Sequence, residues 1–195
     1  MNILLLALLG GILGRWHGGG FQGWTPHPKI VKDVYWATVP ATLAALTVLD
    51  ATQNVWLGLA ALVVAGALCS LGIATGNSRF RDLGTFKGTP RTVKLEFIIK
   101  WLHGRIPEYW YDVLGLSVIG FAAVSGFVVT VAWVDPVAAG IVAVGGLLKP
   151  VGYCVGLALA KRGWVFTDRN YNVLGEFVAG ALAYGAMGLA TTVGG

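Results

Sequence analysis

The chain has 195 residues, of which 56% are hydrophobic and only 12% are charged, roughly half the charged fraction of an average soluble domain. Its mean hydropathy of +0.72 and its long apolar runs exclude a water-soluble globular fold, which would have to leave much of that surface in water. The net charge is +5, but the basic residues do not form a stripe of the kind that recognises nucleic acid. This favours anionic lipids over nucleic acid as the partner.

The apolar runs predict an all-α fold, a polytopic transmembrane helix bundle of about six spans in a single domain over residues 1–195. The first two runs are short, since 13 or 14 helical residues reach only about 20 Å. Five complete spans, or four with a re-entrant segment, are the alternatives. In chain order the predicted spans are residues 2–14, 36–49, 55–75, 110–134, 137–160 and 173–192.

The first span, residues 2–14, is expected to stay in the mature protein. It lacks the basic n-region of a signal peptide, because its first charge, Arg15, follows the apolar stretch. Residues 14–20 then read Gly-Arg-Trp-His-Gly-Gly-Gly. Glycine-rich backbone beside arginine can hold a phosphate or a lipid headgroup, so Arg15 and His17 are candidate headgroup ligands; ordinary interfacial arginines are the alternative.

The second and third spans are predicted to form a hairpin around a short turn that contains Asp50. Asp50 belongs either to a solvated turn or to the mouth of a pore. A basic segment, residues 76–109, follows. Its start provides three more candidate headgroup ligands, and residues 92–103 have the helical spacing of an interfacial amphipathic helix. The three ligands are Arg79, Arg81 and Asp82.

Two charged residues fall inside the last two spans. Lys149 lies near the middle of span 137–160 and is followed by Pro150, which removes a helical hydrogen bond and frees a carbonyl. A charge at bilayer depth usually faces the bundle interior or a water-filled cavity. Glu176 lies one turn into span 173–192. Both are candidate pore or solute-binding residues, with a snorkelling lysine and a structural ion pair as the alternatives.

The basic residues give the bundle an orientation. Thirteen of the fourteen lysines and arginines fall in three segments, residues 15–35, 76–109 and 161–172, which alternation of six spans places on one face. Basic loops face the cytoplasm, so both termini are predicted to be non-cytoplasmic. Lys149 is the exception.

Two residue types support a membrane bundle. The 29 glycines allow close helix packing, as in Gly152-x-x-x-Gly156 and Ala181-x-x-x-Gly185, although chance can also produce this spacing. Tryptophan favours the membrane interface, and five tryptophans fall at or near predicted span ends. They are Trp36, Trp56, Trp110, Trp133 and Trp164.

No pattern of an enzyme, a metal site or a cofactor site is present. The chain lacks Gly-x-Ser-x-Gly, His-x-x-x-His and Cys-x-x-Cys, so no catalytic residue, metal ligand or cofactor is assigned. Cys69 and Cys154 fall inside apolar runs and are expected to be small core residues.

Three short stretches carry a resemblance. Gly-Arg-x-His-Gly-Gly-Gly at 14–20, Gly-x-x-x-Phe-x-Asp-Leu-Gly at 76–84 and Leu-Gly-Glu-Phe-x-x-Gly-Ala at 174–181 resemble small multi-pass membrane proteins of tailed phages and prophages. The resemblance implies a bacterial inner-membrane location and a viral origin, and it assigns no catalytic residue. The Ser-Gly-Asn-x-Gly motif of membrane glycerol-phosphate acyltransferases, which are of similar size, is absent.

The sequence therefore supports three hypotheses. The first is a channel or carrier for a small solute or ion, with Lys149, Glu176 and Asp50 along its polar interior. The second is a protein that binds lipid headgroups, or an enzyme that acts on lipids, through the basic segments. The third, which the resemblance suggests, is a holin-like lysis or host-takeover protein. A homo-oligomer is compatible with all three.

Overall fold

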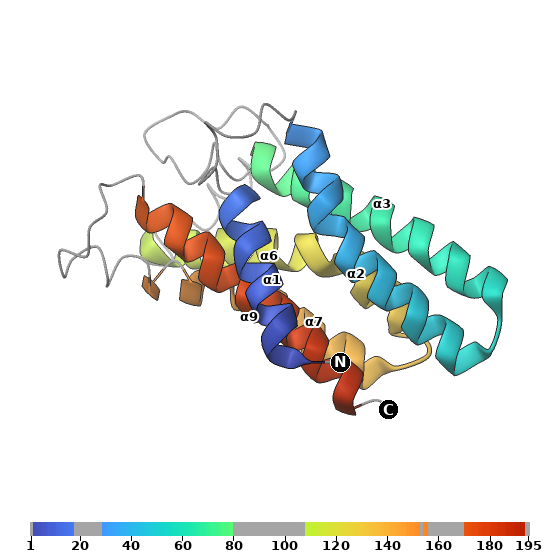
Figure 1. Cartoon of the computed structure of the whole chain (residues 1–195). Helices are drawn as coiled ribbons and strands as arrows, with labels where there is room; N and C mark the ends of the chain where they lie inside the picture. Colours follow the sequence, from blue (N-terminus) through green and yellow to red (C-terminus); the bar gives the residue numbers. More distant parts are fainter. Residues whose placement is uncertain (1, 18–28, 80–107, 153, 156–169, 194–195) are drawn as a thin grey trace.

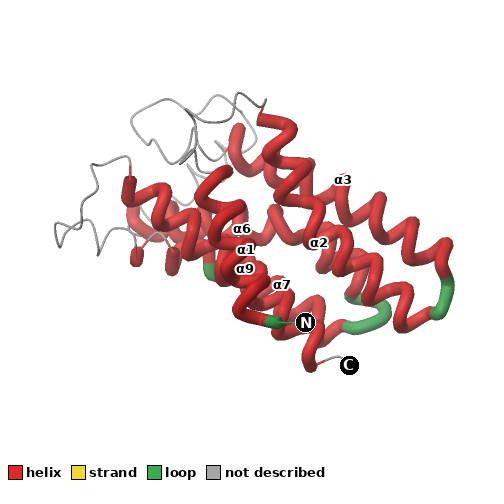
Figure 2. The backbone as a smooth tube through the Cα atoms, in the orientation of Figure 1, coloured by secondary structure: helices red, strands yellow, loops and turns green. Residues whose placement is uncertain are grey.

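A computed structural model describes residues 2–17, 29–79, 108–152, 154–155 and 170–193. These residues form helices joined by short turns and contain no strand, which confirms the all-α prediction for this part of the chain (Figure 2). The predicted interfacial helix at 92–103 lies outside the described residues. The six helices are α1 (Ile3–His17), α2 (Lys29–Thr52), α3 (Val55–Arg79), α6 (Glu108–Val131), α7 (Pro136–Leu147) and α9 (Asn170–Val193) (Figure 1).

The six described helices pack as a ring. Following contacts from one helix to the next, the order is α1, α9, α7, α6, α3 and α2, and α2 touches α1 again. The most extensive contacts are those of α1 with α9 and of α2 with α3. Because α1 and α9 come from opposite ends of the chain, the ring is closed by a long-range contact and not only by hairpins.

The bundle has two distinct ends (Figure 1). At one end, which we call the turn end, lie the α2–α3 turn, the α6–α7 turn, the start of α1 and the end of α9. At the opposite end, which we call the basic end, lie the helix termini that flank the three basic segments. These termini are His17, Lys29, Arg79, Glu108 and Asn170.

Helix α2 extends beyond the predicted range 36–49 in both directions. Its polar residues stay inside the helix because threonine hydroxyls donate back to carbonyls one turn earlier. Thr38 Oγ1 donates to the Val34 carbonyl at 2.9 Å, and Thr42 and Thr47 do the same to Thr38 and Leu43. The predicted span was too short because it treated this polar start as a loop.

Side-chain caps define both hairpin turns. The Asn54 Oδ1 accepts hydrogen bonds from the amides of Trp56 at 2.9 Å and Leu57 at 3.3 Å, which satisfies the start of α3. The Asp135 Oδ1 accepts from the Ala138 amide at 2.8 Å at the start of α7, where Pro136 occupies the first turn. The predicted turn around residues 50–54 therefore acts as a helix cap.

The Asp135→Ala variant is expected to be less stable by about 1 kcal/mol, because it leaves the Ala138 amide at the start of α7 without its acceptor. The measurement is the apparent melting temperature of the purified protein in detergent. Asp50→Ala is the control, since Asp50 is an exposed acid at the same end but lies in the last turn of α2. Equal melting temperatures of the two variants would argue against a stabilising cap.

Three described helices are long and apolar enough to cross a membrane, over Val34–Thr52, Val55–Ile73 and Leu114–Val131. The other apolar helical stretches among the described residues are shorter, over Ile3–Gly14, Pro136–Gly152 and Phe177–Val193. Large apolar side chains cover the outside of the bundle, such as Leu4, Val63 and Val129. This exposure is what a membrane protein presents to lipid.

Small residues set the closest helix crossings. A Cβ placed on Gly180 would collide with the Gly10 carbonyl, so only glycine allows α1 and α9 to meet there. The same holds for α6 and α7 at Gly120 and Gly146. Small residues thus allow close helix packing at these crossings, as predicted. Of the glycines in the two predicted motifs, Gly185 only approaches the Ala7 side chain, and Gly156 lies outside the described residues.

Candidate functional site

A cavity of about 40 Å³ lies where all six described helices converge, nearer the basic end than the turn end. Its wall consists mainly of glycine and alanine, with two isoleucines, and contains two side chains that carry a polar group, Lys149 and Trp36. The described lining residues are Gly14, Trp36, Ile73, Ile119, Gly120, Ala123, Gly146, Lys149, Ala179, Gly180 and Ala183.

A helix break places Lys149 at this cavity. Helix α7 ends at Leu147, Leu148 forms a turn, and a short helical stretch resumes over residues 149–152. Pro150 has no amide hydrogen, so the hydrogen bond that would continue α7 past Gly146 cannot form. The predicted continuous span 137–160 is therefore interrupted next to its charged residue.

Neighbouring groups satisfy the carbonyls at the break. The amide of Val151 donates to the Leu148 carbonyl at 2.9 Å, and the Ser117 Oγ of α6 donates to the Leu147 carbonyl at 3.0 Å. The amide of Leu148 donates to the carbonyls of Val144 and Gly146. The break is thus a defined structure, held to α6 by a side-chain hydrogen bond.

Glycine at position 120 makes room for the lysine. A Cβ built on Gly120 would lie only 2.8 Å from the Lys149 Cβ and would collide with the Gly146 carbonyl. The lysine stem therefore passes directly against the backbone of α6. Lys149 itself is half-buried.

The second polar group of the cavity is the indole of Trp36. Its side chain is 8% exposed, and its Nε1–H is buried without a hydrogen-bond partner among the described residues. The Tyr184 hydroxyl donates to the Trp36 carbonyl at 2.5 Å, and the two rings pack with centroids 4.8 Å apart. Tyr184 thus fixes the position of Trp36 while leaving its N–H unpaired. A buried donor without a partner is costly.

Lys149 is the one charged residue among the described lining residues of the cavity. The acids whose side chains the structure describes, Asp50 and Asp135, lie at the turn end. Both of these acids therefore lie far from Lys149.

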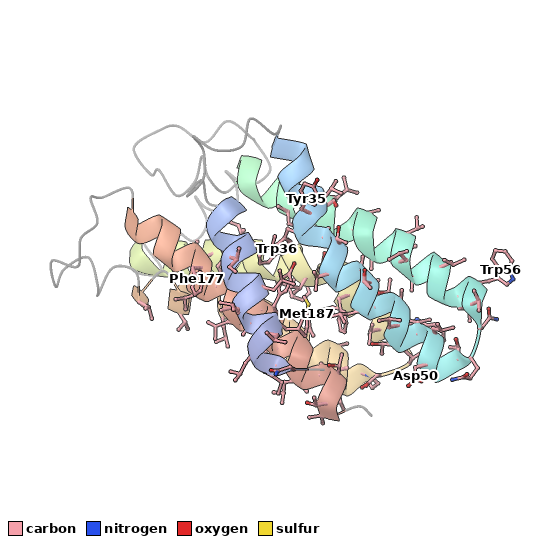
Figure 3. The ribbon with its side chains drawn as sticks, in the orientation of Figure 1. Tyr35, Trp36, Asp50, Trp56, Phe177 and Met187 are labelled. Atoms are coloured by element: carbon pink, nitrogen blue, oxygen red, sulfur yellow. The ribbon has the colours of Figure 1, made fainter. Side chains whose placement is uncertain are left out.

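An apolar layer of buried side chains lies between the cavity and the turn end. We define this layer by three fully buried side chains of the core: Phe127 of α6, Val142 of α7 and Met187 of α9. Phe127 lies one turn beyond the cavity residue Ala123 on α6, and Met187 lies one turn beyond Ala183 on α9. Figure 3 shows Met187 inside the bundle, between Trp36 and the turn end.

The structure separates one predicted pore residue, Asp50, from another, Lys149. Lys149 lines the cavity, whereas Asp50 is exposed at the turn end of α2 (Figure 3). Glu176 belongs to α9, one turn before Ala179 and Gly180 of the cavity wall, and its side chain lies outside the described part. The structure thus does not bring Asp50 to Lys149.

The predicted headgroup ligands lie at or beyond the basic end. Arg15 and His17 belong to the last turn of α1, and Arg79 ends α3, but their side chains lie outside the described part. Arg81 and Asp82 are outside the described residues altogether. Among the side chains that are described, no group of three His, Cys, Asp or Glu residues is close enough to hold a metal ion.

Trp36 was predicted to lie at the membrane interface, and this assignment was wrong because the residue faces the core. A signal was present in the sequence: Trp36 shares one helical stripe with Pro40, Ala44 and Val48, all of which are buried. Trp56 and Trp133, in contrast, are 79% and 60% exposed near the turn end, as expected of interfacial tryptophans.

Comparison with known protein families, with curated proteins and with solved structures finds no match for this chain. We therefore infer its function from the residues around Lys149.

Proposed function

We propose that the chain is a polytopic protein of the bacterial inner membrane that binds a small solute or ion in the cavity at Lys149 and carries it across. The observation behind this proposal is a lysine at a helix break that lines a cavity within an apolar bundle. Charged residues at membrane depth are rare, and they mark substrate or ion pathways. Interrupted helices at such a depth are typical of the binding sites of transporters.

The packing supports six spans, although only three described helices are long enough to cross by length and composition alone. Each shorter apolar helix packs against another helix of the ring instead of lying apart from it. Helix α1, for example, runs along α9 through the close approach of Gly10 and Gly180. A short helix within a bundle crosses where the bilayer thins locally or where flanking residues reach the interface.

The two ends of the bundle support the orientation. The helix termini that flank the three basic segments share one end, which we assign to the cytoplasm by the positive-inside rule. The start of α1 and the end of α9 lie at the other end, which makes both termini non-cytoplasmic. The cavity then lies closer to the cytoplasm.

The apolar layer favours a carrier or a gated path over an open pore. Its side chains are fully buried, so no water-filled path leads from the cavity to the turn end through them. A solute bound at Lys149 would pass only after the helices move apart, as in alternating access.

The proposal is tested by flux through proteoliposomes that contain the full-length chain. The solutes are a panel of small labelled anions, cations and neutral molecules. The Lys149→Met variant is expected to lower the flux of the transported solute by at least about tenfold, because the solute loses a charge-assisted contact in a water-poor site. Size-exclusion profiles and helix content are compared to confirm that the variant folds.

The matched control is Leu148→Met, which introduces the same side chain one position earlier at an exposed residue. It is expected to leave flux unchanged. If Lys149→Met transports as well as the wild type, or if the wild type transports nothing in the panel, the proposed function is wrong.

The other two hypotheses stay predictions. Headgroup binding depends on Arg15, His17, Arg79, Arg81 and Asp82, whose side chains lie outside the described part of the structure. The holin-like hypothesis and the phage origin depend on the resemblance alone. No contact among the described side chains favours either over transport.

A further inference from the structure

We infer that helices α1 and α9 move as one unit against a second unit of α2, α3 and α6, and that Tyr184 and Trp36 hold the two units together beside the cavity. The inference rests on the proposed function for its purpose, which is to expose the binding site of a carrier. It has its own test, however, since the distance between the two units can be measured without transport.

Backbone contacts hold each unit together. In the first unit, which Figure 1 shows as the blue and red helices, a Cβ on Gly180 would collide with the Gly10 carbonyl. In the second unit, a Cβ on Gly126 of α6 would collide with the Ala65 carbonyl of α3, and α2 contacts both of these helices. Backbone atoms cannot rotate away, so the helices within each unit are expected to stay together.

The boundary between the two units is packed differently. The contacts of α2 with α1 and α9, and of α6 with α9, are few compared with those inside each unit. The two units meet there through buried side chains of one core, such as Phe127 and Met187. Side chains move between staggered rotamers, so this boundary can rearrange more easily than the glycine crossings can.

Helix α7 connects the two units, because it has extensive contacts with both α6 and α9. A Cβ on its Gly146 would approach the Gly120 carbonyl of α6, and a Cβ on Gly145 would collide with the Ala186 side chain of α9. Since α7 runs from the turn end and ends at Leu147, it joins the units in the half of the bundle that contains the apolar layer. A rotation about α7 would therefore move the basic end most.

A hydrogen bond crosses the boundary at the cavity. Pro40 lies inside α2 and has no amide hydrogen, so the Trp36 carbonyl lacks its partner within the helix. The hydroxyl of Tyr184, which is fully buried on α9, donates to this carbonyl at 2.5 Å, and the two rings pack together. Trp36 lines the cavity opposite Ala183 of α9. Tyr184 thus binds a carbonyl of the other unit that α2 itself leaves open.

The test is the distance between two spin labels on the full-length chain in neutral detergent, measured by double electron–electron resonance. The labels are attached at Ile12 of α1 and Val34 of α2, two exposed positions near the basic end on opposite sides of the boundary. The native cysteines are first removed by Cys69→Ala and Cys154→Ser. Two distances are expected. Tyr184→Phe keeps the ring but loses the hydrogen bond, so it should raise the population of the longer distance about fivefold.

Two controls separate this movement from a general loss of structure. A label pair inside the second unit, at Val34 and Leu114, should give one narrow distance with and without Tyr184→Phe. Thr130→Val removes another buried hydroxyl, which donates to the Gly126 carbonyl of its own helix at 2.6 Å. This variant should leave the distances between Ile12 and Val34 unchanged.

The outcomes distinguish this inference from the proposed function. A single distance between Ile12 and Val34, or two distances whose populations do not respond to Tyr184→Phe, overturns the inference. Equal broadening of both label pairs also overturns it, because the units would not be rigid. Two distances that respond to Tyr184→Phe, without flux of any solute, support the movement and overturn transport. Flux that depends on Lys149, with one fixed distance, supports transport and overturns the movement.

Discussion

The Gly146→Leu variant is expected to lose about 3 kcal/mol of stability or more, enough to prevent correct folding in many membrane preparations. A Cβ on Gly146 would lie 2.6 Å from the Val124 Cγ2 and 2.8 Å from the Gly120 carbonyl oxygen. One of these contacts is with backbone, which cannot rotate away. Accommodation of leucine therefore requires α6 and α7 to separate, and this separation would also disturb the cavity.

Gly140→Leu is the matched control on the same helix. A Cβ there meets nothing within 4 Å, and leucine favours a helix over glycine by up to about 1 kcal/mol. We expect this variant to be as stable as the wild type or slightly more so. The measurement is thermal unfolding in detergent, followed by helix content. If the two leucines lower the melting temperature equally, the close crossing of α6 and α7 is incorrect.

The length and composition of the apolar runs were enough to predict an all-helical membrane protein, because apolar runs of this length are typical of membrane-spanning helices. Helix ends were harder to predict. The start of α2 contains lysine, aspartate and threonine, which resemble a loop in a hydropathy profile. The interruption of α7 depends on Pro150 together with a hydrogen bond from Ser117, a residue 30 positions earlier than Leu147.

Of the two polar side chains in the cavity, the sequence predicted one, Lys149, and missed the other, Trp36. Lys149 stood out because it alone breaks the charge pattern of the chain. Trp36 did not, since a tryptophan near a span end suits either the interface or the core. The choice is made by Tyr184, 148 positions further along, whose hydroxyl bonds the Trp36 carbonyl. Local patterns carry no information about such a distant partner.

Asp50 was open to two interpretations. An acid between two apolar runs fits the mouth of a pore as well as it fits a turn. The structure places it on the exposed side of the last turn of α2, where its backbone carbonyl accepts a hydrogen bond from the Gln53 side chain at 2.7 Å. The turn interpretation therefore describes its surroundings better.

The Phe127→Ala variant is expected to be less stable by about 3 kcal/mol, because it removes one of the largest fully buried side chains. The lower part of the usual range applies, since lipid also solvates apolar groups of the unfolded chain and leaves mainly the cost of the cavity. Val129→Ala is the control, as Val129 is 58% exposed on the same helix.

The same variant probes the role of the apolar layer. The space left by Phe127 would adjoin the cavity through Ala123, one turn away on α6, and would thin the barrier between the cavity and the turn end. If the layer is the gate, a Phe127→Ala protein that still folds should transport the solute faster than the wild type in proteoliposomes. The double variant with Lys149→Met should keep part of this leak, because passage through an opened gate depends less on binding. Flux that is unchanged in Phe127→Ala, although the protein is folded, would mean that the solute crosses by another path.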